Sequence, residues 1–245
     1  ELLAHHYLAA DQREPAIRYL IRAAERARTL FAHRAALACY DRLLDLLARP
    51  DDRAARYDVL HKRAEVLGWV GDRDAQGRDL EKMIALGHDL ADDTRLAQAL
   101  YLRSEWHRIQ GRYGLAIKDA EAALHIYQEL EDDHGRARSI SQLGHSLLDT
   151  DDPSRAAAFF REALPIQQDV GDQVGQIECL MGLARVAQYE GDLFQAQMYC
   201  QRSLCLARDL GDVRRIGHAL SSVGLGYVDL GDMAAAESYL LQALE

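Results

Sequence analysis

Few segments of this sequence combine residue types that could do chemistry. The stretch GDRDAQGRDL, which begins at Gly71, has glycines spaced loosely like those of a phosphate-binding loop. It lacks the Lys-Ser or Lys-Thr pair that would contact the phosphates, and Gly77 falls inside a predicted helix. His5 and His6 are metal-ligand types, but adjacent residues on a helix point in different directions and cannot share one ion. We therefore expect no cofactor and no metal in this chain.

The cysteines, and the absence of two common catalytic motifs, also indicate that the chain carries out no chemistry. All four cysteines lie within helical patterns and form no C-x-x-C pair, so we expect reduced thiols that act as small hydrophobic side chains. They are Cys39, Cys179, Cys200 and Cys205. The sequence contains neither the His-Glu-x-x-His motif of zinc proteases nor the Gly-x-Ser-x-Gly motif of serine hydrolases. The chain is therefore predicted not to be an enzyme, and no residue receives a catalytic role.

The composition favours a helical protein. The chain has 245 residues, of which 49% are hydrophobic, only 7% are aromatic and four are proline. Its formal net charge is −10, and a net acidic domain repels phosphate backbones. The sequence has no signal peptide and no run of about 18 apolar residues. We expect a soluble cytoplasmic segment without a nucleic-acid or membrane partner. Because it starts at Glu1 and stops within an apparent helix at Glu245, we expect it to be part of a longer protein.

The tripeptide Leu-Gly-Asp opens and closes the segment 210–232, which otherwise has the pattern of one helix. Glycine is favoured just after a helix, where it becomes left-handed without strain, and aspartate is favoured at the N-cap of the next helix. Aspartate recurs every twenty residues, except at Arg112, and occupies the positions Asp52, Asp72, Asp92, Asp132, Asp152, Asp172, Asp192, Asp212 and Asp232. Each twenty-residue unit is therefore predicted to hold one helix of about sixteen residues and a short turn.

A second period, of forty residues, groups these helices into hairpins. Small side chains recur seven residues before alternate turns, at Ala64, Ser104, Gly144, Ala184 and Gly224. Such residues let two helix axes approach closely, and a hairpin cannot bury both of its faces alone. We therefore predict an all-α fold, an α-solenoid of about six stacked antiparallel helical hairpins. The predicted repeats span about 15–51, 52–91, 92–131, 132–171, 172–211 and 212–245, after an N-terminal helix in 1–14.

The segment IGHALSSVGLGYVDLGDMAAAESYLLQAL resembles the tetratricopeptide repeat. The resemblance rests on the small residue Gly224, the aromatic Tyr227, the turn residue Gly231, and Ala236 and Ala243. The familiar repeat has about 34 residues, whereas this one has forty and replaces the usual proline with Gly-Asp or Asp-Asp. This is similar to the long-helix variety of kinesin light chains and bacterial regulators. The resemblance covers roughly residues 15–245 and weakens in the first repeat.

The N-terminal stretch ELLAHHYLAADQREPAIRYLIRAAERA adds a second resemblance. It resembles the start of the helical arm in bacterial STAND-type signalling ATPases, large proteins that join an ATPase module to a repeat arm. The resemblance implies that the arm senses a ligand or partner and controls the ATPase. A nucleotide site of such a parent protein would lie outside this chain.

In the tetratricopeptide repeat family, the first helix of each hairpin lines a concave groove that contacts the partner. Carried over onto this sequence, the groove residues are Asp58, His61, Glu65, Trp69, Gln98, Tyr101, Glu105, Arg108, Arg138, Ser141, His145, Asp149, Glu178, Met181, Arg185, Gln188, Tyr189, His218, Ser221, Leu225 and Asp229. We expect Trp69, Tyr101, Met181 and Tyr189 to be exposed anchors of the kind that binding surfaces use.

Several functions remain open for such a groove. It could belong to the sensor arm of a larger bacterial signalling or transcription regulator and bind a protein, a peptide or another domain of the same parent chain. It could also belong to a free-standing adaptor or scaffold, or to a domain that senses a small molecule. Solvated helix surfaces carry mixed charges too, so an arm without a groove partner is a further interpretation. In the first two cases, Arg108 and Arg185 are expected to pair with carboxylates of the partner.

Overall fold

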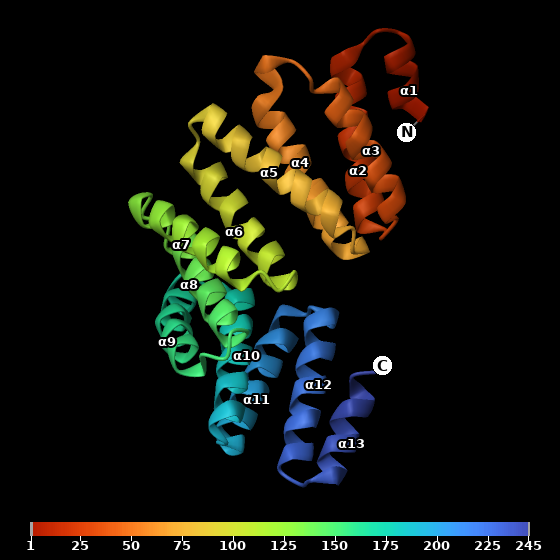
Figure 1. Ribbon diagram of the computed structural model, residues 1–245. Helices are drawn as coiled ribbons and strands as arrows, with labels where there is room; N and C mark the ends of the chain where they lie inside the picture. Colours follow the sequence, from red (N-terminus) through yellow and green to blue (C-terminus); the bar gives the residue numbers. More distant parts are fainter. Residues whose placement is uncertain (1, 245) are drawn as a thin grey trace. The chain divides into compact units, whose positions relative to one another are not determined.

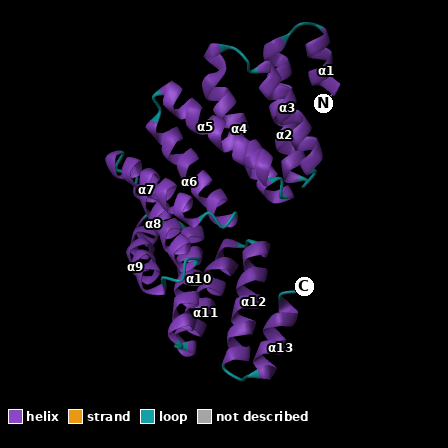
Figure 2. Cartoon of the chain, in the orientation of Figure 1, coloured by secondary structure: helices purple, strands orange, loops and turns teal. Residues whose placement is uncertain are grey.

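The structure is a computed structural model that describes residues 2–244, and these form α-helices joined by short turns (Figure 1). Figure 2 shows helices and loops, but no strand, in this part of the chain. The described residues divide into two compact units: the N-terminal unit ends at Trp106, and the C-terminal unit begins at His107. No helix among them has the length and apolar character needed to cross a membrane.

The helices follow one another with little intervening chain. Those that begin in the N-terminal unit are α1 (Leu2–Ala9), α2 (Arg13–Thr29), α3 (His33–Leu46), the 3-10 turn η1 (Pro50–Asp52), α4 (Arg53–Val70), α5 (Arg73–Leu90) and α6 (Asp93–Ile109). Those of the C-terminal unit are α7 (Tyr113–Glu129), α8 (Asp133–Leu148), α9 (Pro153–Asp169), α10 (Gln173–Glu190), α11 (Leu193–Leu210), α12 (Val213–Asp229) and α13 (Met233–Gln242).

Within each unit, helices that follow one another in sequence pack against one another. In the N-terminal unit α2 packs on α3, α3 on α4, and α4 on α5. In the C-terminal unit the same holds from α7 to α13, and α8 also contacts α10, the corresponding helix of the next hairpin. The prediction of an all-α solenoid built from stacked helical hairpins is confirmed.

The turns use the left-handed conformation, as the recurring glycines predict. Gly71, Gly191 and Gly211 follow their helices with φ of 79°, 78° and 70°. Other turns place a residue with a Cβ there, including Asp151 with φ of 65° and Phe31 with φ of 55°. A left-handed residue other than glycine costs about 1–2 kcal/mol, so packing must hold these turns against the local preference of the chain.

The aspartates that follow the turns cap the next helices. In eight of them, one carboxylate oxygen accepts a hydrogen bond of 2.9–3.1 Å from the backbone N–H three residues later. These are Asp72, Asp92, Asp132, Asp152, Asp172, Asp192, Asp212 and Asp232. The predicted cap at Asp52 was wrong. This residue ends the 3-10 turn, and its carboxylate instead accepts from the backbone N–H of Arg49 at 3.0 Å and pairs with Arg13.

Small residues bring α8, α9 and α10 into close contact around one aromatic ring. Phe160 of α9 is fully buried between Gly144 of α8 and Gly182 of α10. A Cβ added at Gly144 would lie 2.8 Å from the Phe160 ring, and one added at Gly182 would lie 2.4 Å from it. Both distances are shorter than van der Waals contact, so these two glycines leave the room that the ring occupies.

We expect Asp192→Ala to lower the free energy of unfolding by about 0.5–2 kcal/mol, because α11 loses the acceptor for the backbone N–H of Gln195. Urea unfolding followed by circular dichroism measures this change. Asp192→Asn keeps an acceptor oxygen and should retain most of the stability. An equal loss in both variants would show that the charge, rather than the cap, matters at this position.

We expect Gly182→Ala to destabilise the protein by about 1–3 kcal/mol, because the new methyl group overlaps the buried Phe160 ring. Gly114→Ala is the matched control, since a Cβ at this helical glycine meets nothing within 4 Å. Because alanine favours the helix, the control should not lose stability. Equal melting temperatures for the two variants would contradict the packing argument.

Candidate partner-binding surface

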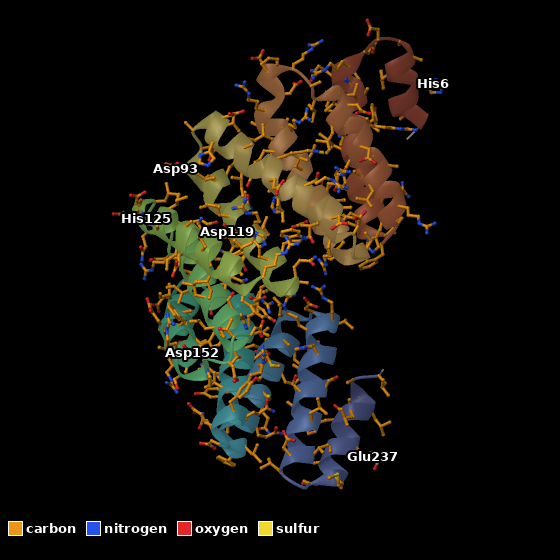
Figure 3. All side chains as sticks on the ribbon, viewed as in Figure 1. His6, Asp93, Asp119, His125, Asp152 and Glu237 are labelled. Atoms are coloured by element: carbon orange, nitrogen blue, oxygen red, sulfur yellow. The ribbon has the colours of Figure 1, made fainter. Side chains whose placement is uncertain are left out.

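The predicted partner residues lie on α4, α6, α8, α10 and α12, which we call the first helices because each opens a hairpin. Figure 3 shows the side chains of the chain as sticks on these helices and their neighbours. In both units, several charged members of the set have ion-pair partners on a neighbouring hairpin.

In the N-terminal unit, the acidic residues of α4 pair with basic residues of the helices before and after it. The Glu65 carboxylate accepts from Arg28 of α2 at 3.4 Å, and the His61 ring lies 3.8 Å from the same carboxyl group. Asp58 accepts from Arg95 of α6, also at 3.4 Å. These charged side chains join successive hairpins, while their outer parts remain in contact with solvent.

One of the expected aromatic anchors is buried. Tyr101 has only 5% of its surface exposed, so the prediction that it is an exposed anchor was wrong. The reason is its place on α6, one turn from Ala97 and Ser104, which are both fully buried. Gln98 and Glu105 of the same helix are partly buried.

Trp69 is exposed, as expected, and belongs to an aromatic cluster that the sequence analysis did not find. Its side chain ends α4 with 46% exposure, and its ring lies 5.7 Å from that of His33. His33 in turn contacts Phe31, which is 77% exposed, at a ring distance of 6.2 Å. In the sequence, Phe31 itself could have indicated this cluster. It stands in the turn at a left-handed position that most other turns give to glycine.

In the C-terminal unit, two arginines share one carboxylate. Asp149, just after α8, accepts from Arg108 at 2.8 Å through one oxygen and from Arg185 of α10 at 2.9 Å through the other. The exposed side-chain fractions are 17% for Asp149, 27% for Arg108 and 42% for Arg185. Burial opposes ionisation of Asp149, but the hydrogen bonds from the two arginines outweigh it and lower the pKa of this carboxyl group. The carboxylate is thus less exposed than Arg185 and restrains the guanidinium through this hydrogen bond.

His145, one turn before Asp149, is held neutral by its surroundings. Burial lowers the pKa of its imidazole to about 3, and the positive charges of Arg108 and Arg185 act in the same direction. Its ring packs edge-on against Phe160 at a centroid distance of 4.8 Å. His145 thus adds no positive charge to this surface at neutral pH.

The middle of α10 is less accessible than its end. Burial raises the pKa of the Glu178 carboxyl group, although the positive charges of Arg138 and Arg215 oppose this shift. Met181, one turn further along, was predicted to be an exposed anchor but is partly buried, as are Arg138 and Arg215. These side chains offer a partner less surface than the residues at the C-terminal end of the helix.

An open pocket lies at that C-terminal end. It has a volume of about 320 Å³ and is lined by Arg185, Gln188 and Tyr189. Tyr189 is 57% exposed, so its ring presents a large apolar face to solvent. The Gln188 side chain donates to the Asp229 carboxylate at the end of α12, at 3.4 Å. Three of the predicted partner residues, which are neighbours on α10, therefore line one pocket.

The remaining predicted residues divide between surface and core. His218 and Leu225 of α12 are exposed, while Ser221 is partly buried and donates to a backbone carbonyl of its own helix at 3.0 Å. Ser141 was predicted for the groove but is only 3% exposed. Its hydroxyl accepts from the buried Gln167 at 2.8 Å, so it serves the packing of α8 on α9 and not the surface.

The described residues show no arrangement typical of metal or redox chemistry. The acidic and histidine side chains labelled in Figure 3 are spread along the chain from His6 to Glu237. Among the side chains that the structure describes, which do not include that of His5, no three His, Cys, Asp or Glu come together in a way that could hold a metal ion. Burial raises the pKa of the Cys179 thiol to about 12 and that of the Cys200 thiol to about 11, so neither forms a reactive thiolate at neutral pH.

Comparison with known protein families agrees with this architecture. Models of the tetratricopeptide repeat family match residues 95–169 and residues 218–245. These two segments of the chain are therefore tetratricopeptide repeats. No curated protein matches the chain by sequence.

Solved structures show the same fold at low sequence identity. BtubC from P. vanneervenii is 20% identical, with a TM-score of 0.65 over 94% of this chain and 89% of that one. A Rap protein complexed with competence and sporulation factor is 14% identical, with a TM-score of 0.72 over 95% of this chain and 75% of that one. A STAND protein with a tetratricopeptide repeat sensor from Pyrococcus horikoshii is 14% identical, with a TM-score of 0.68 over 97% of this chain but 38% of that one.

Because the unfolded chain binds a proton at His145 more readily than the folded chain, acid should destabilise the fold. We expect the free energy of unfolding to fall by up to about 1.4 kcal/mol per pH unit between pH 6.5 and about pH 3, relative to His145→Gln. Urea titrations at several pH values measure this difference. His125→Gln, at a side chain that is 72% exposed, is the control and should follow the wild type. Parallel curves for wild type and His145→Gln would contradict the assignment.

Proposed function

We propose that this chain is a non-catalytic interaction domain that binds a protein or peptide on the first helices of its repeats. The observation that carries the proposal is the pocket at the end of α10, where an exposed aromatic ring lies beside an arginine that Asp149 holds in place. Rigid aromatic and arginine side chains are the residues that most often dominate protein interfaces. The pocket is open to solvent, which fits one residue of a larger partner better than an enclosed small molecule.

We infer further that the domain is the sensor arm of a larger bacterial signalling or transcription regulator in the cytoplasm. Supporting this, the similar STAND protein contains a tetratricopeptide repeat sensor, and the present chain covers 38% of that protein. The similar Rap protein was solved in complex with competence and sporulation factor, which supports a bound factor as the partner here. The partner of this arm is then a protein, a peptide or a domain of the same parent chain.

A free-standing adaptor is the second candidate. It is favoured by the comparison with BtubC, of which the chain covers 89%. The gene that encodes the chain distinguishes the two candidates. A Gly-x-x-x-x-Gly-Lys-Ser/Thr motif upstream of Glu1 supports the sensor arm. A reading frame that contains only repeats supports the adaptor.

Replacing an exposed anchor should weaken partner capture without unfolding the domain. We expect Trp69→Ala and Arg185→Gln to keep the helical circular dichroism signal and each to weaken binding about thirtyfold, the effect of losing about 2 kcal/mol at an interface hot spot. The measurement is capture of labelled proteins from a cell lysate, followed by titration of the recovered partner. Arg161→Gln changes the net charge equally at an exposed residue of α9 and should bind normally. Unchanged binding in both test variants would refute the proposed surface.

A further inference from the structure

The end of α10 defines the chemistry of the segment that binds there. We propose that the pocket lined by Arg185, Gln188 and Tyr189 takes an extended peptide segment through one acidic side chain, which pairs with Arg185, and a neighbouring apolar side chain, which packs on Tyr189. This inference rests on the proposed function and specifies the partner that the same surface accepts.

The orientation of Arg185 favours a carboxylate. Its Nη2 donates to Asp149 at 2.9 Å, and a guanidinium group has five N–H donors in a planar fork. The bond to Asp149 therefore leaves donors for a ligand in the pocket that Arg185 lines. Although it pairs with Asp149, the Arg185 side chain remains 42% exposed, so part of it is accessible to a ligand. An arginine fixed in this way loses little side-chain entropy when it binds a carboxylate.

The local charge also favours an anionic group. Arg108 and Arg185 bring two positive charges to the single negative charge of Asp149. His145 beside them is neutral and contributes none. The two arginines thus outnumber the one carboxylate that they share, in a chain whose net charge is −10.

The other side of the pocket limits the partner to one acidic residue. Gln188 donates to Asp229 at 3.4 Å, which places a negative charge beside the pocket on the α12 side. A second carboxylate of the partner would meet this charge and be repelled. Between the two sides, the ring of Tyr189 is 57% exposed and gives an apolar neighbour a flat surface to cover. The expected segment therefore has a single acidic residue next to an apolar one, and not an acidic run.

A library of random twelve-residue peptides displayed on phage tests this inference on the whole chain. We expect the wild type to enrich peptides with one Asp or Glu next to an apolar residue, and Arg185→Glu to enrich Lys or Arg at that place. Arg161→Glu, an equal charge change on α9, should enrich the same peptides as the wild type. Enrichment of peptides without an acidic residue would overturn the inference and leave the proposed function standing. No enrichment at all would count against both.

Titration of one enriched peptide by fluorescence polarisation tests the pairing itself. We expect about thirtyfold weaker binding for Arg185→Gln, as for the whole partner, and for the peptide with its acidic residue replaced by the amide. The two changes together should be little worse than either alone, because they remove the same interaction. Tyr189→Ala should weaken both forms of the peptide equally. Additive effects of Arg185→Gln and the amide peptide would show that the acidic residue binds elsewhere.

Discussion

The structure depends on one local motif, in which a left-handed turn residue is followed directly by an aspartate that caps the next helix. At Gly191 and Asp192, for example, the chain reverses with φ of 78° and then donates the Gln195 N–H to the Asp192 carboxylate at 2.9 Å. A turn this short forces two long helices to lie antiparallel and in contact. The packing of the helices, including which side chains meet between them, depends on this repeated turn geometry.

Contact between helices at this distance requires small residues at particular places. Phe160 fits only because Gly144 and Gly182 have no side chains there. The ring also contacts His145, whose burial keeps the imidazole neutral. The packing of α8 therefore affects the charge of the nearby surface. His145 packs on the buried Phe160 ring, and one turn later Asp149 pairs with Arg108 and Arg185.

Several charged side chains of the first helices form ion pairs with neighbouring hairpins. Asp149 joins Arg108 to Arg185 across three hairpins, and Asp58 joins α4 to Arg95 of α6. Such partly exposed pairs add little stability individually. They do fix the directions of long side chains, and a binding surface gains from this because ordered side chains lose less entropy when a partner arrives.

The sequence by itself determined the helical class, the hairpin turns and most of the caps, because these follow from local rules about glycine, aspartate and apolar spacing. It could not separate surface from core on the first helices. Tyr101 and Ser141 occupy positions that the family pattern assigns to a groove, yet both are buried, since packing between neighbouring helices decides which side of each helix is covered. The hydrogen bonds of Asp149 to Arg108 and of Gln188 to Asp229 each join residues 41 positions apart, so only the tertiary structure could bring these partners together. The three residues that line the pocket, by contrast, are neighbours on α10.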